Sequence, residues 1–578
     1  MDLDHDIAGA ILAGFDKHYR IFRETAAAAQ GRFERAEWGT VREVSRARID
    51  LYDERVRETV AVIADRFPAA RSDDSLWPRV KRAYIELLYG HLRPELAETF
   101  FNSVACRVLD RTYYRNEYIF WRPAVSTEFV DGEQPTYRCF YPAEMGFRRT
   151  LSAIVESFGL QVPFDDLQRD LRRVVRALRD QLPGPRTRHA NLQVQVLSSL
   201  FFRNTGAFVV GRVLNGSDEH PFAVSLRHVA GRRSIYMDAL LLTSAQIGRI
   251  FNLSRAYFTV DMEVPSAFVG FLRQLMPTHT AAELYTAVGL QKQGKTLLYR
   301  DLHEHLKHSS DRFVVAPGVR GLVMVVFTLP SFPFVFKLIR DEFRPPKQSS
   351  RAEVRGKYLW VKHHDRAGRM ADTLEYSDVA FPLERFDSLL LAELETQCGS
   401  IVERDGDRVI VRHLYIERRM TPLDVFLAAV DEPQARSALL EYGRAIRELA
   451  EAGVFPGDLL CKNFGVTRAG RVVFYDYDEV TSLTDVTFRL LPPARDEADE
   501  TASEPWFHVG PQDVFPEEWP TFLFRTERDR SLFLELHAEL VDPRWWQARQ
   551  KEVRAGVIGD AFPYPEELRF GVRYAVVT

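Results

Sequence analysis

The chain has 578 residues, which is too long for one ordinary hydrophobic core, so two or more domains are expected. Apolar residues make up 46% and charged residues 27% of the chain, which is typical of a globular protein and excludes a disordered one. A formal net charge of −4 and the lack of any apolar run near 18 residues give no reason to expect nucleic acid or a membrane as a partner.

The cysteines and the N-terminal segment favour a reducing compartment. Cys106, Cys139, Cys398 and Cys461 form no close pair of the kind that binds zinc or makes a redox motif. The segment 1–6 is acidic and lacks the basic and then apolar layout of a signal peptide. We therefore expect a cytoplasmic protein with reduced cysteines.

The first half of the chain has mainly helical patterns. Apolar residues recur at helical spacing within 7–22, and helices are also predicted over 167–182 and 281–307. A β-hairpin is predicted around Asn215-Gly216, a dipeptide typical of tight turns between strands. Because no reactive cluster of residues occurs here, residues 1–310 are expected to form a mostly helical domain with some strands.

The pattern changes near residue 311. Three antiparallel strands are predicted over 313–316, 322–327 and 334–339, with a glycine-bearing turn between the first two and Lys337 on the third. A protein kinase N-lobe begins in this way, so a domain boundary is expected within 305–315. The expected fold class is α+β, and the expected second domain is bilobal and kinase-like and covers residues 311–578, with an N-lobe at about 311–416 and a C-lobe at about 417–578.

Lys337 is the first candidate binding residue. It lies between Phe336 and Leu338, and lysine is scarce, with only eleven among the 77 lysines and arginines. A buried ammonium is costly unless it meets an anion, and the phosphates of ATP are the natural candidate. The alternative is a lysine on an edge strand that reaches water. Glu353 and Glu393 are candidate carboxylate partners.

The turn before Lys337 is the second candidate. Gly318 and Gly321 carry no Cβ, so their backbone amides can approach a phosphate. Pro-Gly is foremost a turn dipeptide, and its value here is that Gly318 precedes Lys337 by nineteen residues. The residues assigned to this nucleotide-binding turn are Ala316, Pro317, Gly318, Val319, Arg320, Gly321 and Leu322.

The third candidate is the set Asp458, Asn463 and Asp476. The spacing is typical of the catalytic and metal loops of protein kinases, in which one carboxylate orients the attacking oxygen and an amide and a second carboxylate hold Mg²⁺. A hairpin around 468–470 is predicted to bring Asp476 back to face Asn463, and oxygen ligands suit Mg²⁺. The alternative is that these three polar residues cap turns and have a structural role.

Several kinase landmarks are replaced. Pro456-Gly457 stands where kinases carry His-Arg before the catalytic aspartate, and Asp476-Tyr-Asp478 replaces Asp-Phe-Gly. Asp372 lies in a polar loop after a helix, where a cap or turn role would ordinarily be favoured. Asp478 adds a carboxylate beside the expected metal site.

The chain resembles the bacterial isocitrate dehydrogenase kinase/phosphatase family along essentially its whole length. The motifs that carry the resemblance are long and unusual: Glu98–Ser103, Ala316–Gly321, Asp365–Thr373, Arg412–Met420, Phe455–Asp458, Lys462–Thr467, Val473–Glu479, Ser503–Trp506 and Asp513–Glu518. The resemblance implies an N-terminal regulatory domain, a C-terminal bilobal kinase-like domain and a cytoplasmic homodimer. It also implies that one active site both phosphorylates a serine of isocitrate dehydrogenase and removes that phosphate, which controls flux between the citric acid cycle and the glyoxylate bypass.

The resemblance further implies roles for particular residues. ATP would be bound by Ala316–Leu322 and Lys337, and Asp372 would be an active-site residue on the strength of the resemblance alone. The resulting hypothesis is that Asp458 orients the serine hydroxyl and that Asn463 and Asp476 hold Mg²⁺. Asp372 and Asp478 are the carboxylates left to serve dephosphorylation, with water or ADP as the phosphate acceptor.

Two alternatives remain open from the residues alone. The first is an inactive kinase-like scaffold that binds nucleotide, which the missing His-Arg and the altered Asp-Phe-Gly favour and the retained Lys337, Asp458, Asn463 and Asp476 oppose. The second is a kinase of another substrate. The basic stretch 345–364 is a candidate element for recognising a protein substrate.

Overall fold

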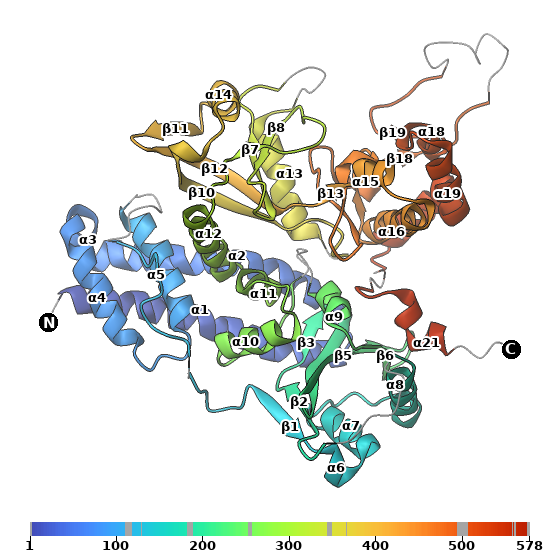
Figure 1. The fold of residues 1–578 in the computed structure, drawn as a ribbon, viewed down its shortest axis with the longest axis horizontal. Helices are drawn as coiled ribbons and strands as arrows, with labels where there is room; N and C mark the ends of the chain where they lie inside the picture. Colours follow the sequence, from blue (N-terminus) through green and yellow to red (C-terminus); the bar gives the residue numbers. More distant parts are fainter. Residues whose placement is uncertain are drawn as a thin grey trace. The chain divides into compact units, whose positions relative to one another are not determined.

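The computed structural model describes residues 3–109, 118–128, 130–181, 189–251, 257–343, 349–365, 367–493, 507–557, 559 and 562–574. The chain forms two compact units. Unit 1 consists of Met1–Ser310, Asp378–Ala380 and Phe562–Thr578, and unit 2 consists of Asp311–Ser377 and Phe381–Ala561. Figure 1 labels the helices and strands of both. In the described residues, no helix is both long enough and apolar enough to cross a membrane.

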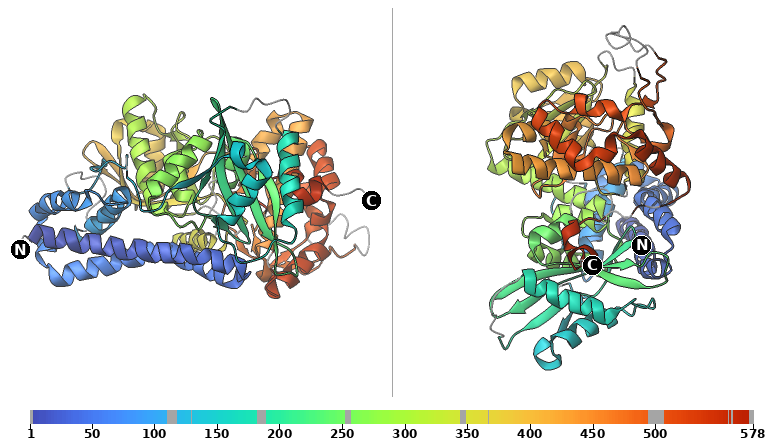
Figure 2. Two further views of the ribbon diagram at one scale, coloured as in Figure 1. Left: turned by 90° about the horizontal axis from the view of Figure 1, so that it is seen from below. Right: turned by 90° about the vertical axis from the view of Figure 1, so that its right-hand side faces the viewer.

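Long helices form the first part of unit 1. They are α1 (Leu3–Glu34), α2 (Trp38–Arg66), α3 (Ala69–Ser72), α4 (Trp77–Leu88) and α5 (Pro94–Leu109). Helices α1 and α2 run side by side along most of their length (Figure 2, left). The apolar stripe from Ile7 to Phe22 is buried, as its helical spacing predicts, and every described side chain of α5 except Ser103 and Arg107 is buried.

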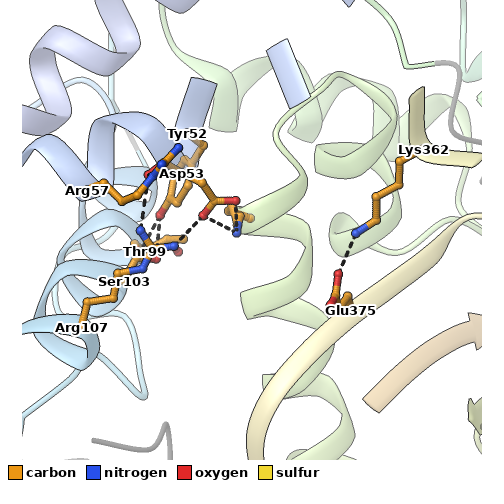
Figure 3. A network of polar contacts seen from close by, with 9 residues as sticks. Tyr52, Asp53, Arg57, Thr99, Ser103, Arg107, Lys362 and Glu375 are labelled. Atoms are coloured by element: carbon orange, nitrogen blue, oxygen red, sulfur yellow. Dashed lines mark hydrogen bonds and ion pairs between the residues drawn. The ribbon is translucent and has the colours of Figure 1, made fainter. Parts of the chain in front are cut away.

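A polar network joins α2 and α5 to a third helix of unit 1. The Asp53 carboxylate of α2 accepts hydrogen bonds from Arg107 of α5 at 2.9 Å and from Lys292 at 3.0 Å. Lys292 lies on α12 (Gln291–His308). The neighbouring Tyr52 hydroxyl lies 2.9 Å from Ser103 Oγ, so α2 is fixed to α5 at two successive positions (Figure 3).

An antiparallel sheet completes unit 1. Its strands are β1 (Tyr137–Phe140), β2 (Gln193–Leu197), β3 (Phe201–Arg203), β4 (Gly206–Asn215), β5 (Asp218–His228) and β6 (Ile235–Leu241), in the order β1-β2-β4-β5-β6 with β3 paired to β4. The predicted hairpin is confirmed: β4 and β5 join at Gly216, which has a φ of +68°. The sheet packs against α8 (Leu167–Gln181), which begins where the sequence predicts it to begin.

One sequence prediction in unit 1 needs correction. The single helix expected over 281–307 is two helices, α11 (Ala281–Ala287) and α12. The break falls at Gly289, whose φ of +86° lies in the left-handed region that ends helices. The expected α+β class, with a mostly helical first domain, is confirmed.

The end of the chain packs against the sheet of unit 1. The Tyr564 hydroxyl donates to the buried carboxylate of Asp238 on β6 at 2.7 Å, and Arg569 Nε lies 3.1 Å from the same Oδ2 atom. The Arg569 and Arg227 guanidinium groups lie 3.7 and 4.5 Å from the Phe562 ring centroid. Residues 562–574, which we expected in the second domain, therefore form part of unit 1.

Two tyrosines of residues 562–574, Tyr564 and Tyr574, allow this docking to be tested. We predict that Tyr564→Phe lowers the free energy of unfolding of unit 1 by about 1.5–3 kcal/mol, because Asp238 is buried and loses a hydrogen bond to a charged group. The matched variant Tyr574→Phe removes a hydroxyl that donates to exposed Asp180, and it should cost at most about 0.5 kcal/mol. Urea unfolding measures both, and equal costs would contradict the docking.

Two buried carboxyl groups lie on α5. Glu95 Oε1 accepts a hydrogen bond from the Tyr285 hydroxyl at 2.9 Å, and Glu98 Oε1 accepts one from the Ala124 amide at 2.7 Å. Burial, as the largest cause, raises the pKa of each glutamate to about 7.

The pKa shifts predict that the stability of unit 1 falls between pH 4.5 and 8. A folded pKa above the unfolded value of 4.5 gives stability that is complete below pH 4.5 and is lost as the pH rises through 7. Glu95→Gln keeps an acceptor for Tyr285 but cannot ionise, so it should stabilise the protein at pH 8 by about 3 kcal/mol relative to wild type. If the free energy of unfolding changes with pH in the same way for wild type and Glu95→Gln, the prediction is contradicted.

The N-lobe of unit 2 is built on a second antiparallel sheet. Its strands are β7 (Val314–Val315), β8 (Met324–Thr328), β9 (Phe334–Ile339), β10 (Thr373–Pro382), β11 (Val402–Asp405) and β12 (Arg408–Arg418), in the order β10-β12-β9-β8-β7 with β11 paired to β12. The predicted succession β7-β8-β9 is confirmed. Helices α13 (Arg351–His364) and α14 (Ser388–Gln397) accompany this sheet, and Lys362 of α13 binds Glu375 of β10 at 2.9 Å (Figure 3).

The C-lobe is mostly helical. Its main helices are α15 (Leu423–Ala429), α16 (Glu432–Glu451), α18 (Trp519–Leu523), α19 (Glu527–His537) and α20 (Pro543–Arg554). Gly453, with a φ of +78°, follows α16 as the C-terminal signal predicts. Helix α19 packs closely on α16 because Gly443 has no side chain: a Cβ there would lie 2.2 Å from the His537 ring.

Candidate active site

The Asp458 loop follows α16 through the short strand β14 (Val454–Phe455), which pairs with β17 (Thr481–Ser482). Between β14 and Asp458 stands Gly457, with a φ of +93°. The loop between β16 and β17, residues 475–480, carries Asp476 and Asp478 and is called the metal loop below. A Cβ at Gly457 would lie 2.4 Å from the Cβ of Glu479, so only glycine fits where the Asp458 loop passes the end of the metal loop. Gly457, which replaces the arginine of ordinary kinases, is thus required for close packing.

Asn463 and Asp476 lie at the open end of one hairpin. Strand β15 (Phe464–Val466) begins directly after Asn463, and β16 (Val472–Phe474) ends two residues before Asp476. The strands pair in the register Phe464 to Phe474, and the Tyr475 amide donates to the Asn463 carbonyl at 3.1 Å. The structure therefore brings Asn463 and Asp476 to the same end of the hairpin.

Asp458 contacts the same group of residues. Its Oδ1 accepts hydrogen bonds from Asn463 Nδ2 and, at 3.3 Å, from the Leu460 amide. Burial raises the pKa of Asp458, and the negative charge of Asp476 raises it further. Since the charge of Asp476 opposes the ionisation of Asp458, a cation at this position would be stabilising.

The ammonium of Lys337 is buried and paired. Its Nζ lies 2.7 Å from Oε2 of Glu417, with the two side chains only 8% and 1% exposed, and it donates to the Tyr475 carbonyl at 3.1 Å. The second carboxylate oxygen of Glu417 accepts a hydrogen bond from Thr373 Oγ1 at 2.8 Å. Lys337 is therefore fixed between the N-lobe sheet and the residue that precedes Asp476.

The partner of Lys337 is neither of the glutamates that we considered. Glu353 closes a capping box with Ser350 at the start of α13, and Glu393 of α14 contacts Arg320 at 3.3 Å and Arg340 at 3.5 Å. Glu417 comes from β12, beside β9. In ordinary protein kinases the equivalent glutamate comes from a helix, and both sequence candidates lie on helices.

Glu417 reaches Lys337 because of strand register. Lys337 stands opposite Tyr415, and Glu417 stands opposite Val335. Val335 and Lys337 are two residues apart and so share one face of the sheet, which places Glu417 diagonally next to Lys337 on that face.

Asp372 lies beside the metal loop. The bridge between Met370 and Phe474 aligns the Asp372 segment with β16, and the Ala371 amide donates to the Phe474 carbonyl at 2.9 Å. Asp372 is buried and directly precedes Thr373. The structure thus brings Asp372 to the same region as Glu417 and Asp476.

A buried arginine holds the Asp372 segment in place. The Arg369 guanidinium donates to Glu448 at 2.7 Å and to Glu441 at 2.9 Å, both on α16, and to the Val472 carbonyl at 3.0 Å. Tyr477, the residue before Asp478, also contacts the segment, because its hydroxyl donates to the Ala371 carbonyl at 2.6 Å. Asp478 itself is half-buried.

The 316–322 turn connects β7 to β8 and is largely exposed. Gly318 has a φ of +121°, and the Gly321 carbonyl accepts a hydrogen bond from Arg340 at 3.3 Å. Because Glu393 contacts both Arg320 and Arg340, it connects the turn to α14. The turn leads into β8, which pairs directly with β9, the strand of Lys337.

The residues present fit a magnesium ion. Among the described residues, no group of three or more histidines, cysteines, aspartates and glutamates could hold a metal by itself. Asn463 and Asp476 offer two oxygen ligands, since the Asn463 side chain uses its amide nitrogen to bind Asp458. Mg²⁺ is commonly held by one or two protein groups together with substrate phosphates and water.

Three residues with roles at this site were not identified from the sequence. Glu417 lies within the motif Arg412–Met420, but its register with β9 could not be derived. Thr373 and Arg369 lie within the motif Asp365–Thr373, in which only Asp372 was given a role. Of the motifs that carry the resemblance, Ser503–Trp506 lies outside the described residues, as does part of the candidate recognition stretch 345–364.

Comparison with known proteins gives matches along the whole chain. A family model described as the isocitrate dehydrogenase kinase/phosphatase (AceK) regulatory domain matches residues 8–310, and one described as the kinase domain matches residues 311–566. Isocitrate dehydrogenase kinase/phosphatase from Paraburkholderia phymatum is 52% identical over 573 residues, which cover 98% of this chain and 95% of that protein. The proteins of the same name from Burkholderia mallei and Burkholderia pseudomallei are 51% identical with the same coverage.

The ion pair gives a prediction for a double-mutant cycle. Glu417→Gln leaves a buried ammonium without a countercharge, and we expect it to lower the free energy of unfolding of unit 2 by about 3 kcal/mol. Most of this loss should disappear in the background of Lys337→Met, which removes the charge.

The control for this cycle is Glu353→Gln, whose partner is Ser350. Its effect should add to that of Lys337→Met within about 0.5 kcal/mol. Urea unfolding of the four proteins in each cycle measures the coupling, and a coupling with Glu353 as large as that with Glu417 would contradict the assignment.

Proposed function

The chain belongs to the isocitrate dehydrogenase kinase/phosphatase family, and we propose that it uses ATP to phosphorylate a serine of isocitrate dehydrogenase and also removes that phosphate. This pair of activities controls flux between the citric acid cycle and the glyoxylate bypass. The structural observation that carries the proposal is the contact chain from the paired ammonium of Lys337 through Tyr475 and Asn463 to Asp458.

In the kinase direction, the serine hydroxyl attacks the γ-phosphorus of ATP, and the bond to the β-phosphate oxygen breaks to release ADP. Asp458 orients the hydroxyl and accepts its proton, for which its raised pKa is suited. Lys337 and the 316–322 turn bind the phosphates. Bound Mg²⁺, held by Asn463 and Asp476, would neutralise charge on the phosphate oxygens.

In the phosphatase direction, the phosphoserine bond breaks and the phosphoryl group passes to water or to ADP. The two candidate carboxylates that the kinase direction does not use are Asp372, in the segment that pairs with β16, and Asp478, in the metal loop itself. We assign to them the orientation of the acceptor and of the phosphoserine.

The organisation of the molecule follows the family. Residues 1–310 and the segment 562–574 form the regulatory domain, and most of residues 311–561 form the catalytic domain, whose lobes meet near residue 417. The active form is a cytoplasmic homodimer, and the basic stretch before and along α13 contributes to recognition of the protein substrate. The alternative of an inactive scaffold is not favoured, because the relatives with this name match the whole chain.

The test follows phosphate on isocitrate dehydrogenase. With γ-labelled ATP and Mg²⁺, the wild-type chain should label isocitrate dehydrogenase, and with ADP it should then release the label. Asp458→Asn should lower the rate of labelling by about 10²- to 10⁴-fold. Asp372→Asn and Asp478→Asn should slow release more than labelling.

Two outcomes would contradict these assignments. Absence of labelling by the wild-type chain would reject the kinase activity. Equal losses of labelling and release in the Asp372 and Asp478 variants would reject their assignment to dephosphorylation.

A further inference from the structure

Tyr475 is the residue between β16 and Asp476, and its backbone joins two parts of the site. Its amide donates to the Asn463 carbonyl at 3.1 Å, and its carbonyl accepts from Lys337 Nζ at 3.1 Å. The peptide groups of this one residue therefore link the catalytic loop to the phosphate-binding lysine.

The Tyr475 side chain makes the same two connections. The Lys337 ammonium lies 5.1 Å from the centroid of the Tyr475 ring, within the range of a cation–π interaction. The Tyr475 hydroxyl donates to the carbonyl of Lys462, the residue before Asn463.

The Tyr475 ring also lies close to Gly465 of β15. A Cβ placed on Gly465 would lie 2.8 Å from Met420 Cβ and 3.2 Å from Tyr475 Cδ1. One edge of the ring thus lies close to the backbone of β15 at Gly465.

We propose that Tyr475 is a positioning residue whose ring sets the Lys337 ammonium for the ATP phosphates and whose hydroxyl sets the 462–463 backbone for the metal site. The inference rests on the kinase activity proposed above. The two groups of one side chain then have separable effects: the ring acts on nucleotide binding, and the hydroxyl acts on the rate of phosphoryl transfer.

Two substitutions separate these effects. Tyr475→Phe keeps the ring and removes the hydrogen bond to Lys462, so kcat for labelling of isocitrate dehydrogenase should fall roughly 3- to 10-fold while the Kd for Mg·ATP changes less than twofold. Tyr475→Leu also removes the ring, so the Kd for Mg·ATP should rise roughly 3- to 30-fold. Tyr475→Met provides the same loss of aromaticity if the leucine variant does not fold.

The same substitutions in the Lys337→Met variant, which lacks the ammonium, test whether the ring acts through Lys337. In Lys337→Met, the change from phenylalanine to leucine at position 475 should alter the Kd for Mg·ATP less than twofold, because no ammonium lies over the ring. Isothermal titration with Mg·ATP measures the Kd for the full chain, and circular dichroism melting verifies folding. Tyr574→Phe, in unit 1, serves as the matched loss of a tyrosine hydroxyl and should change neither quantity.

The inference is overturned if Tyr475→Leu raises the Kd equally in the wild-type and Lys337→Met backgrounds, or if Tyr475→Phe leaves kcat unchanged. A wild-type chain that binds Mg·ATP but does not label isocitrate dehydrogenase would reject the proposed function instead. In that case the Kd comparison still decides whether the ring sets the ammonium.

Discussion

The buried ion pair between Lys337 and Glu417 is the constraint on which the rest of the site depends. An ammonium that is 8% exposed is costly in an apolar sheet, and the carboxylate that offsets this cost comes from the next strand. Glu417 in turn binds Thr373, which places Asp372, while Lys337 binds the residue before Asp476. One pair of charges therefore connects the sheet to both acidic loops.

Because both partners lie on adjacent strands, the register of the sheet fixes the pair. A pair between a strand and a helix can be broken when the helix shifts, and ordinary protein kinases use this as a switch. Here α13 contacts the metal loop by other means: Lys357 donates to the Val480 carbonyl at 3.2 Å, and the Tyr358 ring lies 5.0 Å from that of Tyr477. A shift of α13 would act on the metal loop and leave the lysine paired.

The local spacing of residues allowed the hairpin between Asn463 and Asp476 and the strand that carries Lys337 to be predicted from the sequence. The contacts that could not be predicted depend on which residues face each other across strands. Glu417 becomes a neighbour of Lys337 only through the pairing of β12 with β9, which joins residues about eighty apart in the chain. From the sequence, Glu393 was a candidate partner of Lys337. Only the fold shows that Glu393 contacts Arg320 and Arg340 instead.

The docking of residues 562–574 makes unit 2 an insertion within unit 1. Tyr564, Leu568 and Phe570 are buried against a sheet whose strands end at Leu241, more than three hundred residues earlier in the chain. A ribosome delivers the chain from its N-terminus, and domains usually fold in that order. In this protein the first unit to emerge must wait for the last residues before it can complete its core, so the catalytic unit can reach its native packing first.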